Sequence, residues 1–378
     1  MKFLAEDKLE SLLKELANAA QVVIPARAED AEGMVSFRAW EPGVEPELDV
    51  LLTRQSAKEF IFKQCEEYLT YHYTMEGETG VPEEEEEGSP GEDEDGLEEI
   101  AHETLRVEAR VEAPPQVLFG LRPCDASGLV QIDNVFSGYG GFYFDPMYNA
   151  RREATTILAV ACAEPRSTCF CTSLGGSPSG TEGVDALFTP VEGGFTVEAL
   201  TDKGEELVKS SAFVDAEESQ KEAAAKVKEE IEGKVDEAFG LEGVRENLQA
   251  NFEDTEGWDE LASRCISCGT CTYVCPNCYC FNITDHKVET SGERVRTWDN
   301  CFNPSYTLET SGHNPRASKR NRFRNRFSHK FWYYPEKYDS LLCSGCGRCI
   351  THCPVRIDLR EVVREMGSPR VAASGEEA

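Results

Sequence analysis

The residues most able to do chemistry are the sixteen cysteines of this 378-residue chain. Two groups in the last third share one spacing, C-x2-C-x2-C-x3-C, and each is followed by proline. Their members are Cys265, Cys268, Cys271 and Cys275, and Cys343, Cys346, Cys349 and Cys353. Cysteines this close together form either disulfides or metal sites. In a reducing compartment disulfides are disfavoured, so we expect these cysteines to bind metal centres. Zinc sites use four ligands in pairs, so two complete runs fit zinc poorly.

This spacing is that of bacterial two-cluster ferredoxins, in which the fourth cysteine of each run binds the other cluster. We therefore expect two [4Fe–4S] clusters with crossed ligand sets. One set is Cys265, Cys268, Cys271 and Cys353, and the other is Cys343, Cys346, Cys349 and Cys275. Three more cysteines lie close in sequence, either as replacement ligands or as packing thiols: Cys278, Cys280 and Cys301.

A looser group lies in the middle of the chain and comprises Cys124, Cys162, Cys169 and Cys171. Cys124 and Cys162 follow predicted strands, and α/β proteins build sites at the carboxyl edge of a parallel sheet. Four cysteines there make a complete ligand set for a third [4Fe–4S] cluster or for zinc, and binding of no metal is the remaining alternative. No G-x-G-x-x-G or Walker motif occurs, so we expect no bound flavin or nucleotide.

The net charge of the chain argues against general binding to nucleic acids or to anionic membrane surfaces. The formal net charge is −32, which repels nucleic acid and anionic lipid. A basic, aromatic segment at residues 313–335 runs against this background. It can offset cluster charge, dock an acidic partner or form a solvated face, and we expect no nucleic-acid partner. We also expect no membrane span, and the charged N-terminus predicts a cytoplasmic protein.

The elements that would position these cysteines follow an α/β pattern. Apolar runs predict four strands, the last two joined as a hairpin: 117–121, 156–162, 184–191 and 194–200. Helical spacing predicts four helices, at 4–18, at 126–136 with Asp125 as its cap, at 216–237 and at 241–263. Acidic residues crowd positions 76–99, which favours a disordered loop.

We therefore predict a mixed α/β domain, a helical linker and a bacterial two-cluster ferredoxin-like domain. The predicted boundaries are 1–215 for the α/β domain with its acidic loop and cysteine site, 216–264 for the connector, 265–365 for the ferredoxin-like domain with a basic insertion, and 366–378 for a flexible tail.

Several motifs occur together: FGLRPCD, CFCTSLGG, RCISCGTCTYVCPNCYCF, RTWDNC and CSGCGRCITHCPV. In these the chain resembles the iron–sulfur beta subunit of cytosolic sulfhydrogenases and the corresponding iron–sulfur chain of anaerobic sulfite reductase. The resemblance implies an electron-transfer subunit of a hetero-oligomer, with a flavoprotein partner of the FAD/NAD(P)H type and a catalytic redox subunit. The catalytic subunit is a hydrogenase, a sulfite or sulfur reductase, or a heterodisulfide-reductase-like assembly, and the resemblance leaves this choice open. It also implies that the middle cysteines carry a cluster. The alternative is a catalytic reductase subunit with a substrate-reactive cluster at those cysteines.

Overall fold

The computed structural model describes residues 1–27, 33–50, 52–76, 102–109, 111–138 and 143–370. Its contacts divide the chain into two compact units. The main unit comprises Met1–Lys63, Val111–Cys280 and Trp298–Ala378, and the ribbon unit comprises Gln64–Arg110 and Phe281–Thr297. Apart from residue 76, the predicted acidic loop lies outside the described residues, as does 371–378 of the predicted tail.

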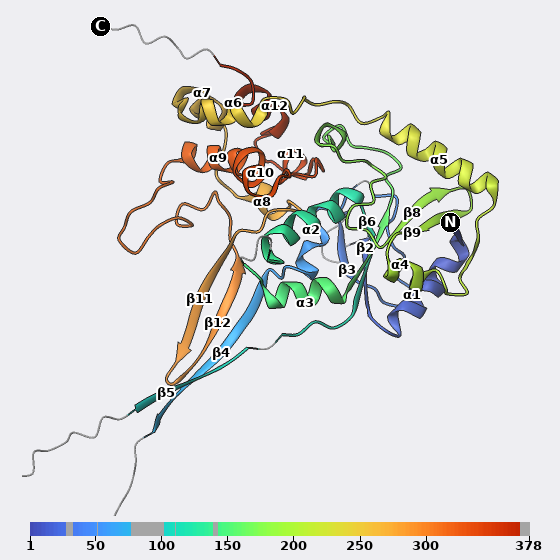
Figure 1. The fold of residues 1–378 in the computed structure, drawn as a ribbon, viewed down its shortest axis with the longest axis horizontal. Helices are drawn as coiled ribbons and strands as arrows, with labels where there is room; N and C mark the ends of the chain where they lie inside the picture. Colours follow the sequence, from blue (N-terminus) through green and yellow to red (C-terminus); the bar gives the residue numbers. More distant parts are fainter. Residues whose placement is uncertain (28–32, 51, 77–101, 110, 139–142, 371–378) are drawn as a thin grey trace, which may run out of the picture. The chain divides into compact units, whose positions relative to one another are not determined.

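An eight-stranded mixed sheet forms the centre of the α/β part of the main unit (Figure 1). Its order is β10-β1-β9-β8-β7-β6-β2-β3, and the pairs within β2-β6-β7-β8 are parallel. The strands are β1 (Lys2–Ala5), β2 (Gln21–Arg27), β3 (Val35–Ala39), β6 (Gln116–Leu121), β7 (Thr155–Val160), β8 (Ala186–Val191), β9 (Gly194–Ala199) and β10 (Phe213–Asp215).

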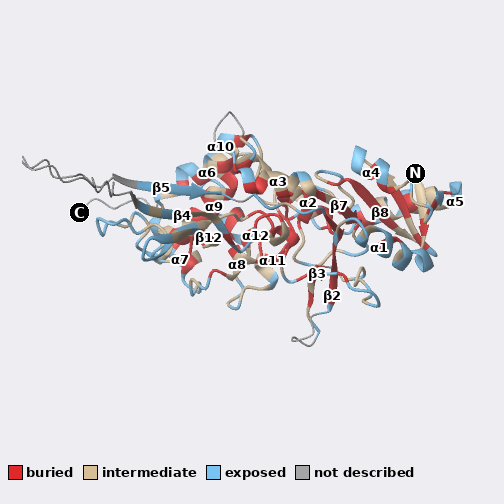
Figure 2. Cartoon of the chain, turned by 90° about the horizontal axis from the view of Figure 1, so that it is seen from below, coloured by how far each residue is buried: buried red, intermediate tan, exposed pale blue. Residues whose placement is uncertain are grey.

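Continuous apolar runs place the parallel strands in the middle of this sheet. Every residue of β6 is buried. Strand β7, labelled in Figure 2, is buried at all but one position. A strand covered on both faces needs apolar side chains on both, so its sequence does not alternate. The antiparallel β8–β9 pair joins Val191 to Gly194, as the predicted hairpin requires. The mixed α/β prediction is thereby confirmed.

Helices and short turns connect the strands of the main sheet. The helices of this part are α1 (Leu9–Ala17), α2 (Pro123–Phe136), α3 (Pro146–Ala154), α4 (Asp202–Leu207) and α5 (Glu218–Glu232). Among the described residues, the main unit has short 3₁₀ turns at Glu6–Lys8, Ala57–Phe60, Thr172–Leu174 and Asn251–Glu253. Helix α1 packs on the sheet through Leu12 and Leu13.

Two local predictions differ from the structure. The first predicted helix begins late, because Leu4 lies in β1, where its backbone pairs with both β9 and β10. In the sheet, the backbone N–H and C=O groups of Leu4 pair with two neighbouring strands. In the first turn of a helix, the backbone N–H groups would have no partner within the helix. Asp125 is not the cap of α2, whose N-cap is Arg122. Its carboxylate is instead paired with Arg348.

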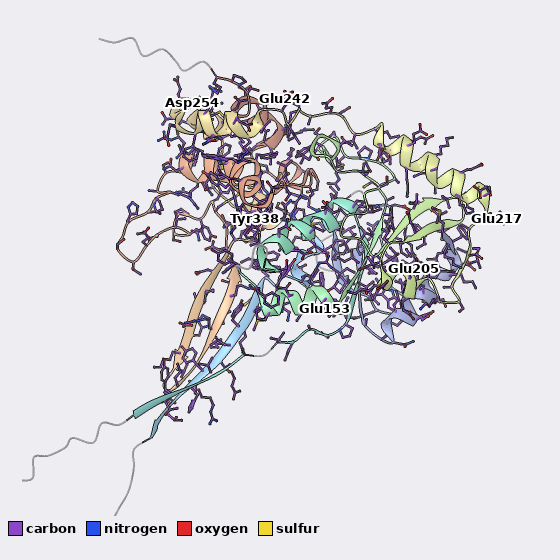
Figure 3. All side chains as sticks on the ribbon, viewed as in Figure 1. Glu153, Glu205, Glu217, Glu242, Asp254 and Tyr338 are labelled. Carbon is purple, nitrogen blue, oxygen red and sulfur yellow. The ribbon has the colours of Figure 1, made fainter. Side chains whose placement is uncertain are left out.

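The predicted helical connector contains two further helices after α5, namely α6 (Val244–Ala250) and α7 (Thr255–Ala262). The single helix expected from 241 to 263 is interrupted at Asp254, labelled in Figure 3. Asp254 has a ψ of 83°, and its side chain accepts a hydrogen bond from the Gly257 N–H. A new N-cap therefore begins α7 where one continuous helix was predicted.

The cysteine-rich end of the main unit is helical. Its elements are α8 (Thr270–Tyr273), α9 (Lys319–Ser328), a π-helical turn (His329–Tyr333), α10 (Tyr334–Tyr338), α11 (Arg348–Thr351) and α12 (Leu359–Met366). Trp258, Phe323 and Phe327 lie in its apolar core together with one face of α12. Because α12 runs to Met366, the helix reaches the first residue of the predicted tail.

The ribbon unit is a four-stranded sheet that the sequence analysis did not anticipate. Its order is β11-β12-β4-β5, with β4 antiparallel to both β12 and β5. The strands are β4 (Cys65–Glu76), β5 (His102–Glu108), β11 (Phe281–Val288) and β12 (Ser291–Trp298). Arg296 and Glu66 form a buried ion pair of 2.5 Å between β12 and β4. Segments distant in sequence therefore make this sheet.

Candidate metal centres

The two four-cysteine runs adopt the same local structure. Gly269 and Gly347 each have a left-handed φ, +72° and +73°, and each is the N-cap of a four-residue helix. A Cβ on Gly269 would lie 2.7 Å from the Asn300 side chain, and one on Gly347 would lie 2.3 Å from the Thr168 carbonyl oxygen. Both positions therefore require glycine, and both bring a helix directly after the second cysteine of the run.

The four cysteines expected to bind the first cluster line one cavity. This cavity of about 40 Å³ has walls that include Cys265, Cys268, Cys271 and Cys353. Cys353 belongs to the second run, and its thiol is close enough to Cys265 to raise the pKa of the Cys265 thiol. Burial raises the pKa of Cys271 to about 11, although Arg326 lowers it. A thiol in this setting becomes a thiolate when a metal centre replaces the proton.

The second predicted ligand set also crosses between the runs. Cys275 of the first run lies within electrostatic range of Cys343, Cys346 and Cys349. Cys275 and Cys346 are buried, and burial raises the pKa of Cys346 to about 12. The structure thus brings the fourth cysteine of each run to the other run, as crossed ligands require.

The four middle cysteines come together beside the second run. Cys124 lies in the first turn of α2, and Cys162 follows the end of β7. The thiols of Cys169 and Cys171 lie within electrostatic range of Cys162, which is also close to Cys124. Burial raises the pKa of Cys162 to about 11 and that of Cys171 to about 12. The expected convergence at the sheet edge is present.

A tight interface joins this middle group to the second run. The Phe170 N–H donates to the Gly345 carbonyl over 2.9 Å, and the Cys169 Sγ lies 3.9 Å from the Cys346 carbonyl oxygen. A Cβ on Gly345 would come within 2.5 Å of the Cys171 Cα. Within the described residues, no three His, Cys, Asp or Glu side chains group closely enough to hold a single metal ion.

A buried ion pair fixes the same interface, and sequence reasoning missed it. The guanidinium of Arg348 contacts the Asp125 carboxylate at 2.6 and 2.9 Å, and both side chains are almost fully buried. Arg348 also donates to the Thr53 carbonyl and hydroxyl oxygens, each over 3.0 Å. Arg348 follows the second run's glycine, and Asp125 follows Cys124, so the pair holds α11 against α2.

Three buried cations surround the first run. Arg326 contacts the Cys278 Sγ at 3.5 Å and the Cys271 carbonyl at 2.9 Å. The Lys330 Nζ lies 3.5 Å from the Cys275 Sγ. The Lys58 Nζ donates to the Cys278 carbonyl over 2.7 Å. None of these three cations has a carboxylate within ion-pair distance in the described part of the chain.

These cations show where the basic segment at 313–335 lies. Its α9 and π-helical turn bury Arg322, Arg326 and Lys330 in the cysteine-rich end of the main unit. Burial by itself lowers the pKa of Lys330, but the nearby sulfurs of Cys275 and Cys278 raise it above its usual value. Buried cations without carboxylates need another anion, and thiolate-bound clusters supply one. The residues present therefore fit iron–sulfur clusters.

Three further cysteines take part in close thiol pairs, Cys278 with Cys275 of the first run, and Cys280 with Cys301. Cys278 donates a hydrogen bond to Cys275, which raises its own pKa and favours the Cys275 thiolate. Cys280 and Cys301 form a second hydrogen-bonded pair. The sequence carries no indication that Cys301, twenty-one positions after Cys280, would return to it.

Comparison with known proteins identifies a matching family model and a similar curated protein. The family model of the 4Fe-4S dicluster domain matches residues 264–357. The Sulfhydrogenase 2 subunit beta of Pyrococcus furiosus is 33% identical over 253 residues, which cover 66% of this chain and 73% of that relative. The chain belongs to the family of sulfhydrogenase beta subunits. The predicted resemblance is confirmed, and this is an iron–sulfur electron-transfer subunit with [4Fe–4S] clusters in its dicluster domain.

No solved structure matches this chain. The described helices include none that is long and apolar enough to cross a membrane.

Proposed function

We propose that this chain relays single electrons between a flavoprotein partner of the FAD/NAD(P)H type and a catalytic redox subunit of the same complex. The observation that carries the proposal is the crossed placement of the two four-cysteine runs around buried cations. The relative is named as a subunit of a sulfhydrogenase, which supports an assembly of several chains. The partners themselves follow from the resemblance in sequence motifs.

The proposed ligands are the eight cysteines of the two runs in their crossed sets, with the middle group as the third. These ligands are Cys265, Cys268, Cys271 and Cys353; Cys343, Cys346, Cys349 and Cys275; and Cys124, Cys162, Cys169 and Cys171. When bound, a [4Fe–4S] cluster accepts and returns one electron. The protein holds it with thiolates, and Arg326 and Lys330 offset the added negative charge.

Proximity supports a role for the middle group in the same relay. Cys169 contacts the backbone of Cys346, a proposed ligand of the second set. The Arg348–Asp125 pair lies between the two groups of cysteines, and both of its side chains are almost fully buried. A buried interface of this kind favours electron exchange, because little solvent has to reorganise.

Reversible electron uptake tests the relay. The anaerobically purified chain is titrated with dithionite, monitored by visible absorbance, and is then back-titrated with a one-electron oxidant. We expect about three electrons per chain to be taken up and returned, one for each of three clusters. A chain from which a chelator has removed the iron serves as the control. Irreversible bleaching, or uptake of about one electron or less, would contradict a relay.

A further inference from the structure

A pocket that the cluster ligands do not line opens on the main unit. Its volume is about 490 Å³, within the range of roughly 300–1,000 Å³ that is typical of small-molecule sites. Its walls include Cys280, Cys301 and Tyr306, together with two basic side chains, Arg316 and Lys337. Tyr338, labelled in Figure 3 at the end of α10, lines the same pocket. Two thiols therefore face a space large enough for a small molecule.

The backbone holds the two thiols together. The Asp299 N–H donates to the Cys280 carbonyl over 3.0 Å, which fixes the segment before Cys301 against Cys280. The Cys301 thiol then hydrogen-bonds the Cys280 thiol, and the Tyr306 hydroxyl makes a second hydrogen bond to Cys280. Cys301 is buried and Cys280 is half-buried, so the pair has one inner and one more accessible sulfur.

Electrostatics distinguish the two sulfurs. Hydrogen bonds from Cys301 and Tyr306 lower the pKa of Cys280, with help from the charges of Lys58 and Arg326. The same hydrogen bond and burial raise the pKa of Cys301. These shifts favour the thiolate, which is the reactive form, at Cys280 and the protonated thiol at Cys301. A half-buried thiolate that lines a pocket, beside a more deeply buried thiol, is the arrangement of a nucleophile and a resolving cysteine.

The basic side chains indicate the charge of the molecule that enters. Neither Arg316 nor Lys337 has a carboxylate partner in the described ranges, and Lys337 lies 4.6 Å from the Tyr143 ring centroid. Burial lowers the pKa of His329 to about 4, so this pocket histidine is neutral. Two uncompensated cations favour an anionic ligand.

We propose that Cys280 and Cys301 are a redox-active dithiol that exchanges with small anionic disulfides bound in this pocket. The Cys280 thiolate attacks one sulfur of the disulfide, which forms a mixed disulfide and releases one anionic thiolate. The Cys301 thiol then loses its proton and attacks the Cys280 sulfur. This forms the Cys280–Cys301 disulfide and releases the second half of the ligand as a thiol. The ligand disulfide is reduced and the protein dithiol is oxidised by the same two electrons.

This inference is independent of the electron relay, because the exchange consumes no electron from a cluster. The reverse reaction, with an excess of a small thiol, returns the pair to the dithiol. Both directions balance without any further reagent.

The test uses 5,5′-dithiobis(2-nitrobenzoate), a disulfide with two carboxylates whose released thiolate is coloured. The full-length, cluster-containing protein carries Cys65→Ser, because Cys65 is an exposed thiol outside the site. We expect a fast phase that releases two equivalents of the coloured thiolate. With Cys301→Ser the fast phase should release one equivalent and leave one nitrobenzoate thiol on Cys280, detected by mass spectrometry. With Cys280→Ser the fast phase should disappear.

A neutral disulfide, 2,2′-dithiodipyridine, separates charge recognition from reactivity. Arg316→Ala and Lys337→Ala should raise the half-saturating concentration of the anionic disulfide several-fold and leave that of the neutral disulfide unchanged. Equal effects on both disulfides would contradict the role given to the cations.

Iron content distinguishes the dithiol from a cluster ligand. Cys280→Ser and Cys301→Ser should retain the iron and sulfide of the parent protein, which also shows that each variant folds. Loss of about four irons in either variant would make these cysteines cluster ligands and overturn the proposal. A fast phase that survives Cys280→Ser would overturn it as well. Cys280→Ala provides a second substitution if the serine variant is not recovered.

Discussion

Lys330 illustrates what single residues contribute beyond cysteine spacing. It carries a positive charge in the interior, 3.5 Å from the Cys275 sulfur, and also donates to the Leu342 carbonyl over 2.7 Å and to the Asn277 side chain over 2.9 Å. A cation held this rigidly stabilises the electron-rich state of any centre bound by Cys275 more than the oxidised state. Its expected effect is therefore on the reduction potential.

We predict that Lys330→Met makes the midpoint potential of one cluster more negative by roughly 100 mV. This corresponds to about 2–3 kcal/mol between unit charges ~6 Å apart in an effective dielectric constant of ~20. A redox titration followed by electron paramagnetic resonance measures the shift. Lys226→Met on α5 removes an exposed lysine as a control and should leave every potential unchanged. Equal potentials in Lys330→Met and the parent would show that Lys330 acts only through packing.

Sequence spacing was sufficient to identify the cysteine groups but not the residues that surround them. The spacing of each run is local, and each middle cysteine belongs to a strand end or an adjoining loop that the sequence indicates. Arg348, Lys330 and Lys58 gain their roles from partners far away in the chain, such as Asp125 and Cys278. The sequence around a basic side chain near cysteines does not indicate whether that side chain will be buried or exposed to solvent.

At the scale of elements, the two short helices α8 and α11 depend on their preceding glycines. Ala at position 347 would have to adopt a φ near +73° and place its Cβ 2.3 Å from the Thr168 carbonyl oxygen. The left-handed backbone alone costs roughly 1–2 kcal/mol for a residue with a Cβ. The clash of this Cβ with Thr168 would also push the second run away from the loop that carries Cys169 and Cys171.

We predict that Gly347→Ala destabilises the protein by more than about 2 kcal/mol, since the clash adds to the backbone cost. We also expect it to lower the iron content by at least about four atoms per chain. Chemical denaturation and iron analysis measure the two effects. Gly233→Ala is the matched control, because Gly233 has a φ of −68° and the nearest atom to its Cβ would be 3.7 Å away. Unchanged iron in Gly347→Ala would contradict the packing described here.

The secondary structure was predictable where one pattern dominated. β6 is apolar at nearly every position and buried throughout, and the α5 sequence is rich in helix-forming residues. The predicted helix boundaries were wrong where other contacts determined the local structure. Leu4 pairs in strand β1 instead of beginning a helix, and Asp254 caps α7 inside a segment predicted as one helix. The ribbon unit was missed because β4 pairs with β12 more than two hundred residues later.

At the scale of the whole molecule, the α/β part and the cysteine-rich end of the main unit share one buried interface. Arg348 and Asp125 join them by a pair that is 1% and 2% exposed at its side chains. A buried pair of this kind costs desolvation free energy, and removal of one partner leaves an uncompensated charge. The pair therefore specifies one arrangement of the middle cysteines against the second run.

We propose that this chain carries three [4Fe–4S] clusters, and metal analysis tests this proposal most directly. Iron, zinc and acid-labile sulfide are measured per chain on anaerobically purified protein, with electron paramagnetic resonance before and after dithionite. We predict about 12 irons and an equal amount of sulfide without zinc, and loss of about a third of the iron in Cys169→Ala. About eight irons, unchanged in Cys169→Ala, would contradict the third cluster and leave the middle cysteines as zinc ligands or free thiols.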